Sequence, residues 1–123
     1  MKKALSISIF GLLIIIIFTM DYSLKGKTLY GKYANTNYQH LICCVEAPHE
    51  PDTLILYSNG NFESRFFGKG RFEVYNGISS RIEFHYKSYE KSASFNTYFS
   101  NKLFEEPKII LNADMNHVYT KIN

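Results

Sequence analysis

The alternation of apolar and polar residues, interrupted by tight turns, is the feature that most constrains the fold of this chain. Residues 81–87 alternate strictly between apolar and polar side chains, and a period of two places successive side chains on opposite faces of a strand. Asn59-Gly60 and Asn76-Gly77 each lie between two such runs. Asn-Gly tolerates the positive φ of a type I′ turn and is the strongest short-range signal for a hairpin. The pattern therefore predicts antiparallel strands joined by short loops.

The same pattern continues through most of the chain and predicts seven or eight short strands. Beyond the N-terminus no stretch has a convincing helical period, and no βαβ unit is present. We therefore predict a mainly β fold, an antiparallel meander that forms a small barrel or a curled sheet, because closure removes exposed strand edges. We predict an irregular segment at residues 34–52, a turn at residues 68–70 and a loop at residues 88–94. The predicted strands are 28–33, 53–57, 61–67, 71–75, 81–87, 95–99, 108–111 and 117–122.

An apolar segment precedes this β region and divides the chain into parts. Lys2 and Lys3 are followed by residues 4–20 without a single charge. A membrane-spanning helix needs about 17 to 25 apolar residues, whereas a cleaved signal needs a shorter stretch and a small-x-small site, which residues 19–24 lack. We expect residues 1–20 to be an uncleaved signal anchor, with a cleaved signal peptide as the alternative. Residues 21–27 would be a tether, and residues 28–123 an extracytoplasmic β domain, secreted if the signal is cleaved.

Charge and composition narrow the classes of partner. The chain has 14 Lys and Arg against 11 Asp and Glu. Because Lys2 and Lys3 precede the apolar run, the rest of the chain holds 12 basic residues against 11 acidic ones, a net charge of about +1. Nucleic-acid binding needs a clustered basic excess, so we expect no nucleic-acid partner. The ten Tyr and ten Phe are typical of strands, where aromatic rings pack well.

Several short motifs of the β region resemble a known group of domains. They are Gly31-Lys32-Tyr33, the run from Asp52 into Asn59-Gly60-Asn61-Phe62, Gly70-Arg71-Phe72 and the closing Tyr119-Thr120-Lys121-Ile122. In this order they resemble the small lipocalin-like β-barrel domains of bacterial lipoproteins and membrane-tethered proteins of unknown function. The resemblance implies a meander barrel that could enclose an apolar cavity, and it carries over no catalytic residue.

The residue types that carry chemistry form no catalytic pattern. Cys43-Cys44, with His40 and His49 nearby, lacks the spacing of two to four residues between cysteines that is usual in tetrahedral metal sites. We expect these cysteines to be small buried hydrophobes. Glu105-Glu106 would point apart in an extended segment and cannot form a facing carboxylate pair. No GxSxG elbow or phosphate-binding glycine loop is present. We therefore expect no enzyme activity, catalytic residue, cofactor or metal.

Aromatic residues supply the candidate interaction surface. Phe66 and Phe67 are neighbours and must face opposite sides of a strand. With Phe66 inward, Tyr57, Phe67 and Tyr75 would form an exterior aromatic strip. Such a strip either stabilises the sheet through cross-strand pairs or contacts another protein. The expected function is a non-enzymatic binding or interaction module, tethered to the membrane through residues 4–20, with an envelope protein or a neutralised toxin as partner. The alternative is a carrier with a lipid or other apolar ligand inside the barrel.

Overall fold

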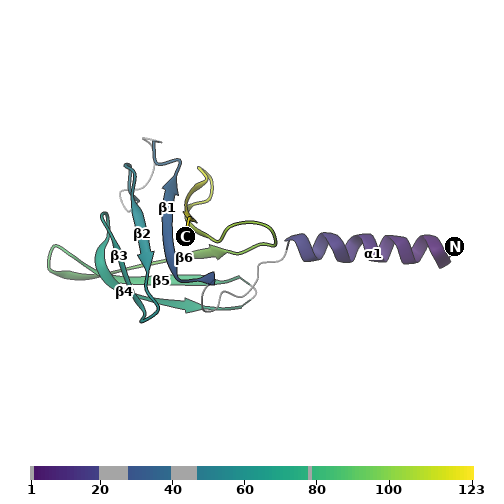
Figure 1. Ribbon diagram of the computed structural model, residues 1–123, viewed down its shortest axis with the longest axis horizontal. Helices are drawn as coiled ribbons and strands as arrows, with labels where there is room; N and C mark the ends of the chain where they lie inside the picture. Colours follow the sequence, from purple (N-terminus) through teal and green to yellow (C-terminus); the bar gives the residue numbers. More distant parts are fainter. Residues whose placement is uncertain (1, 20–27, 40–46, 78) are drawn as a thin grey trace.

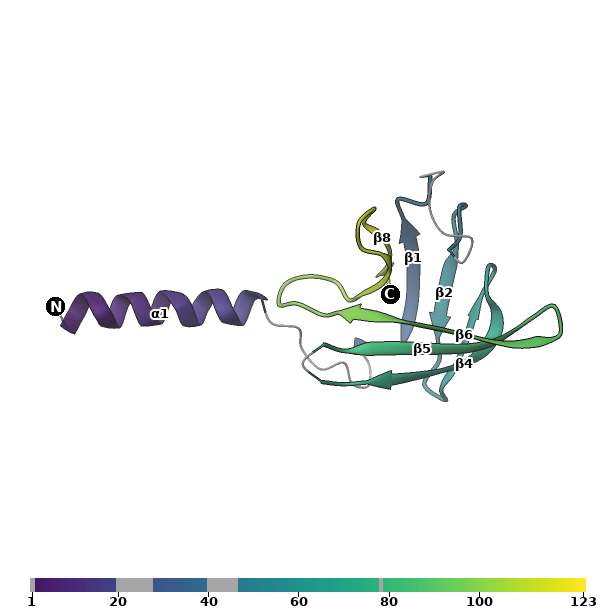
Figure 2. The same ribbon diagram turned by 180° about the vertical axis from the view of Figure 1, so that it is seen from behind.

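The computed structural model describes residues 2–19, 28–39, 47–77 and 79–123. It contains one helix, α1 (Lys2–Thr19), and a β barrel from which that helix projects (Figures 1 and 2). The predicted tether at residues 21–27 lies outside the described residues.

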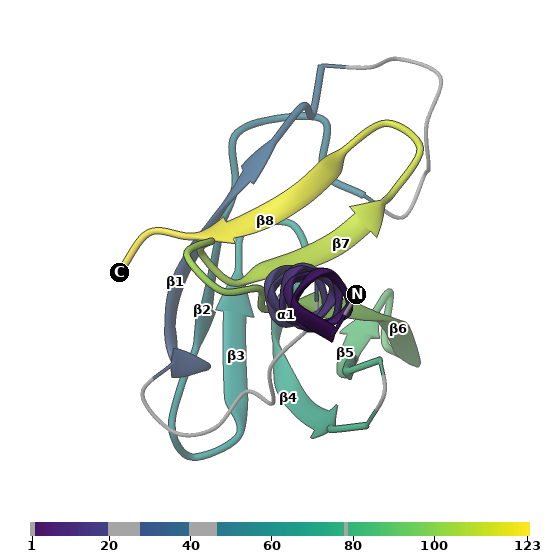
Figure 3. The same cartoon turned by 90° about the vertical axis from the view of Figure 1, so that its right-hand side faces the viewer.

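Eight strands form a closed barrel in which each strand pairs antiparallel with its neighbours in sequence. Pairing of the first and last strands completes the closure, with Tyr33 opposite Lys121 and Thr36 opposite Val118. Figure 3, viewed along α1, shows β8 beside β1 and β7 beside β8. The predicted mainly β fold is confirmed as a closed barrel. The strands are β1 (Gly31–Thr36), β2 (Thr53–Leu56), β3 (Asn61–Ser64), β4 (Gly68–Tyr75), β5 (Arg81–Ser88), β6 (Lys91–Ser100), β7 (Lys108–Asn112) and β8 (His117–Lys121).

Large side chains from all eight strands fill the axis of the barrel and form its core. The rings of Phe62 and Phe84 meet edge to face with their centroids 5.0 Å apart, and Tyr33 meets Phe99 in the same manner. Burial of such a side chain stabilises the fold by about 1.5 to 3 kcal/mol. The buried cluster consists of Leu29, Tyr33, Leu54, Leu56, Phe62, Phe67, Phe72, Ile82, Phe84, Phe99, Ile109 and Tyr119.

The turn between β3 and β4 lies three residues earlier than the sequence predicts. β3 ends at Ser64, whose Oγ accepts a hydrogen bond of 2.8 Å from the backbone N–H of Phe67. Residues 68–70, predicted as the turn, begin β4 instead. Because the chain turns at residues 65–67, the period of two ends at Ser64. Phe67 is consequently 5 % exposed and Phe66 42 % exposed, so the predicted inward Phe66 and outward Phe67 are wrong.

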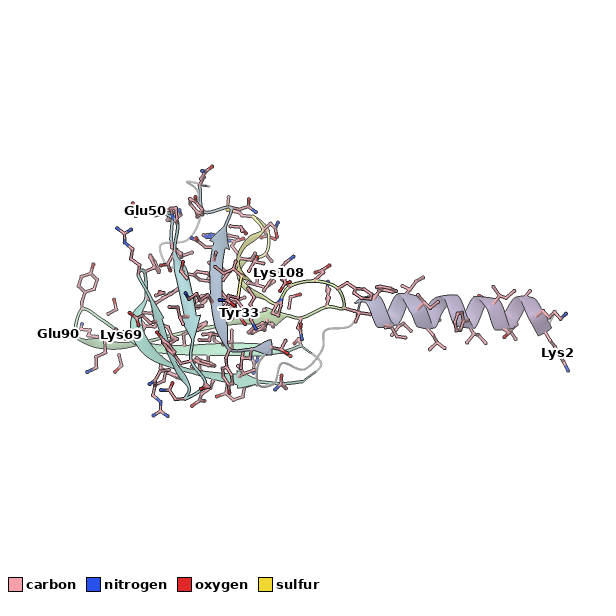
Figure 4. The ribbon with its side chains drawn as sticks, in the orientation of Figure 1. Lys2, Tyr33, Glu50, Lys69, Glu90 and Lys108 are labelled. Atoms are coloured by element: carbon pink, nitrogen blue, oxygen red, sulfur yellow. The ribbon has the colours of Figure 1, made fainter. Side chains whose placement is uncertain are left out.

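The segment predicted as a loop at residues 88–94 is a tight hairpin. β5 and β6 pair from Arg81 opposite Tyr98 to Ser88 opposite Lys91, so that only Tyr89 and Glu90 form the turn. Both turn residues have positive φ, 49° and 67°, which is the requirement of a type I′ turn. Without glycine or asparagine, the turn carries no sequence signal. Its tip, labelled by Glu90 in Figure 4, lies at the end of the molecule opposite α1.

The large apolar side chains of α1 face outward, with exposed fractions of 40 to 73 %. At its end, the ring of Phe18 lies near that of Phe104, with the centroids 5.9 Å apart. Within residues 2–19 and the other described ranges, no helix is both long and apolar enough to cross a membrane. The transmembrane helix expected from the sequence is therefore not found.

Candidate functional site

The structure buries one of the three residues predicted as an aromatic strip. Tyr57 and Tyr75 are 41 % and 46 % exposed, whereas Phe67 is buried among the rings of Phe84, Tyr86 and Phe95. Tyr57 directly follows β2, and Tyr75 is the last residue of β4. The strip is therefore not formed.

Tyr57 and Tyr75 are each paired with a glutamate. The Tyr57 hydroxyl lies 3.3 Å from Glu63 Oε2, and the Tyr75 hydroxyl donates to Glu73 Oε2 at 2.6 Å. The hydrogen bond and the negative charge of Glu73 raise the pKa of Tyr75 above its ordinary value. These contacts make both tyrosines part of a polar outer surface.

A groove at one end of the barrel combines charged side chains with an aromatic ring and is a candidate binding site. Strands alternate in direction, so the connection between β1 and β2 and the turn between β3 and β4 lie at the same end. The groove between them has a volume of about 390 Å³. Its lining consists of Pro48, His49, Glu50, Pro51, Asp52, Arg65 and Phe66; Figure 4 labels Glu50 at this end.

One buried carboxylate holds the two walls of the groove together. Asp52 Oδ1 accepts a hydrogen bond of 3.0 Å from the Arg65 N–H, and Asp52 Oδ2 accepts one of 2.5 Å from the Tyr119 hydroxyl. Burial, followed by the hydrogen bond to Asp52, raises the pKa of Tyr119 far above its ordinary value. The hydroxyl therefore stays protonated and able to donate, and β8 is tied to the groove.

Asn35 of β1 adds a second attachment to the same wall. Its Oδ1 accepts a hydrogen bond of 2.8 Å from the Asp52 N–H, and its Nδ2 donates to the Glu50 carbonyl at 2.7 Å. Asn35 and Asp52 are both buried. Buried polar groups that are fully hydrogen-bonded make a segment rigid. The groove thus has a preformed wall.

The lining of the groove is suited to binding by charge and by stacking. Arg65 supplies a permanent cation and Phe66 an aromatic face that is almost half exposed. Guanidinium groups recognise carboxylates and stack on aromatic faces. Sequence reasoning missed this site because residues 34–52 appear irregular. The only local signals were Asp52 and Ser64, two residue types that commonly cap turns.

Of the other candidates that the structure describes, His49 lines the groove, whereas Glu105 and His85 do not. Cys43, Cys44 and His40 lie outside the described residues. Glu105 is exposed and forms an ion pair of 3.8 Å with Lys108, as is usual for a solvated loop. His85 lies on the outer face of β5, as the alternation of residues 81–87 implies, with Nε2 at 3.7 Å from Glu83 Oε1.

Comparison with known proteins identifies no relative of this chain. No protein-family model, curated protein or solved structure matches this chain.

Proposed function

We propose that this chain is a non-enzymatic binding module whose barrel presents the groove beside Arg65 and Phe66 to a protein partner outside the cytoplasm. The observation that carries the proposal is the filled axis of the barrel. Tyr33, Leu54 and Tyr119 are fully buried in it, so in the described part of the chain the axis is occupied by the protein's own side chains. A small barrel either fills its interior or holds one ligand. A filled barrel acts as a rigid support for a surface site.

The architecture supports the proposal that the β domain is related to the lipocalin-like domains of bacterial lipoproteins and membrane-tethered proteins. The resemblance to those domains implies a closed meander barrel, and the eight antiparallel strands form one. The filled axis favours the binding module over the alternative, a carrier of a lipid or another apolar ligand. Under this proposal the ligand site is at the end of the barrel and not inside it.

The N-terminal segment supports a location outside the cytoplasm. Lys2 and Lys3 precede the uncharged residues 4–20, the charge order of export signals and anchors. The outward-facing apolar side chains of α1 are suited to contact with lipid. We therefore place the barrel at the outer face of the membrane, or in the secreted fraction if the segment is cleaved. An envelope protein is the expected partner.

Site-specific photocrosslinking tests the groove as the contact surface. A photoreactive phenylalanine analogue at Phe66 is expected to crosslink one discrete partner in intact cells, because its ring forms part of the lining. The same analogue at Tyr98, which is 57 % exposed on β6, is the matched control. The crosslink at position 66 should fall at least severalfold with Arg65→Ala, while the protein level stays constant.

Two results would contradict this assignment. Equal crosslinking from positions 66 and 98 would show that the contact is not specific to the groove. An unchanged crosslink in the Arg65→Ala variant would show that the guanidinium takes no part in recognition.

A further inference from the structure

Three metal-ligating side chains meet on the outer face of β4 and β5. Glu73 lies directly opposite Glu83 in the register of the two strands, and His85 follows Glu83 by two residues and therefore lies on the same face. One carboxylate oxygen of each glutamate and one imidazole nitrogen all lie within 4.8 Å of one another. These strands do not line the groove at the end of the barrel.

The two carboxylates lack a permanent cation. Like charges directly opposite each other destabilise an antiparallel pair. Across the described ranges, the only ion pair of either carboxylate is the contact between Glu83 and His85, which is charged only when the imidazole is protonated. Arg71 and Arg81 lie on the same strands, opposite His85 and Tyr75, and neither forms an ion pair there.

A second glutamate on the same barrel shows the ordinary arrangement. Glu63 also meets a tyrosine, Tyr57, but it has Lys69 as a permanent cationic partner at 3.9 Å. Lys69 stands on the outer surface in Figure 4. The site at Glu73 has a second carboxylate and an imidazole in place of the lysine. A cation could therefore bind between the two carboxylates and the imidazole, where no lysine is present.

Tyr75 fixes one of the carboxylates. Its hydroxyl donates to Glu73 Oε2 at 2.6 Å, which leaves the other oxygen of Glu73 for a ligand. Hydrogen bonds of this kind orient the ligands in protein metal sites.

We propose that Glu73, Glu83 and His85 bind a zinc ion on the outer face of the barrel. Imidazole nitrogen and carboxylate oxygen are both zinc ligands, and three protein ligands leave a fourth position for water or a partner's group. Glu73 and His85 are exposed and Glu83 is half-buried, so the ion enters directly from solvent. Tyr75 is a positioning residue, since it touches Glu73 and not the ion.

Calorimetric titration with zinc chloride tests the site in the full-length protein in mild detergent. Cys43→Ser and Cys44→Ser form the background, because thiolates bind zinc strongly. We expect one zinc ion per chain and a rise in Tm on binding. Glu73→Gln, Glu83→Gln and His85→Asn should each abolish this binding. Tyr75→Phe should weaken it by about 10-fold, the lower end of the usual effect of an orienting partner.

Matched controls are made at Glu63 and at its hydrogen-bond partner Tyr57. Glu63→Gln and Tyr57→Phe remove the corresponding carboxylate and hydroxyl and should leave zinc affinity unchanged. Circular dichroism in the absence of zinc confirms that each variant is folded. The proposal is overturned if millimolar zinc gives neither heat nor a change in Tm. It is equally overturned if Glu73→Gln or His85→Asn binds zinc as tightly as the background protein.

Discussion

Phe67→Ala is expected to lower the free energy of unfolding by about 3 to 5 kcal/mol, the usual cost of deleting a buried phenylalanine ring. The ring of Phe67 is stacked near those of Phe84 and Phe95, with centroid distances of 6.3 and 5.9 Å, and meets Tyr86 edge to face. Its removal would leave a cavity among rings that belong to two strands, β5 and β6. Urea denaturation followed by circular dichroism measures the loss.

Phe66→Ala is the matched control because it removes the same ring from the next residue. Phe66 is almost half exposed and makes one ring contact, with Phe67 at 4.8 Å. An aromatic pair of this kind contributes about 0.5 to 1.5 kcal/mol, so we expect a loss of about 1 kcal/mol. A larger loss in Phe66→Ala than in Phe67→Ala would restore the orientation predicted from strand periodicity and would contradict the turn at residues 65–67.

Gly70→Ala is expected to destabilise the barrel by about 3 kcal/mol, the upper part of the usual range for overpacking. A Cβ atom at Gly70 would lie 2.0 Å from the carbonyl oxygen of His85 and 2.7 Å from Phe62 Cε1. Because one of these atoms belongs to the backbone of β5, the two strands would have to separate. The same urea titration would show a lower midpoint for this variant.

Gly77→Ala provides the comparison for this effect. A Cβ atom at Gly77 meets no heavy atom within 4 Å, and its φ lies outside the left-handed region. We expect a change of less than about 1 kcal/mol, with a gain if alanine restricts the unfolded chain. Equal losses in the two variants would show that the close approach of β4 to β5 does not limit the residue at position 70.

The strands and their order were predictable because their signals are local. Alternation at residues 81–87 and the pair Asn59-Gly60 identify strands and a hairpin without knowledge of distant residues. The turn type was not predicted correctly, since only Gly60 has positive φ there. The Gly60 N–H donates to the Tyr57 carbonyl at 3.1 Å and the Tyr57 N–H donates to the Asn61 carbonyl. The glycine is therefore the last residue of a three-residue loop, a common alternative to the two-residue type I′ turn.

The positions of the candidate sites were not predictable because they depend on contacts between distant residues. Asp52 fixes the turn at Arg65 from 13 positions away, and this turn decides which of Phe66 and Phe67 faces solvent. In the same way, Glu73 and Glu83 meet only through the register of β4 and β5. Residue spacing identified His85 as an outward side chain, but not its neighbours on the adjacent strand.

Native mass spectrometry of the gently purified full-length protein tests the central claim, a barrel filled by its own side chains, most directly. The account predicts that no apolar molecule accompanies the folded chain, and that the only added mass is that of a zinc ion, which chelation removes. A reproducible organic mass that survives gentle release from detergent and disappears on denaturation would contradict the account. That result would place a ligand within the barrel and favour the carrier.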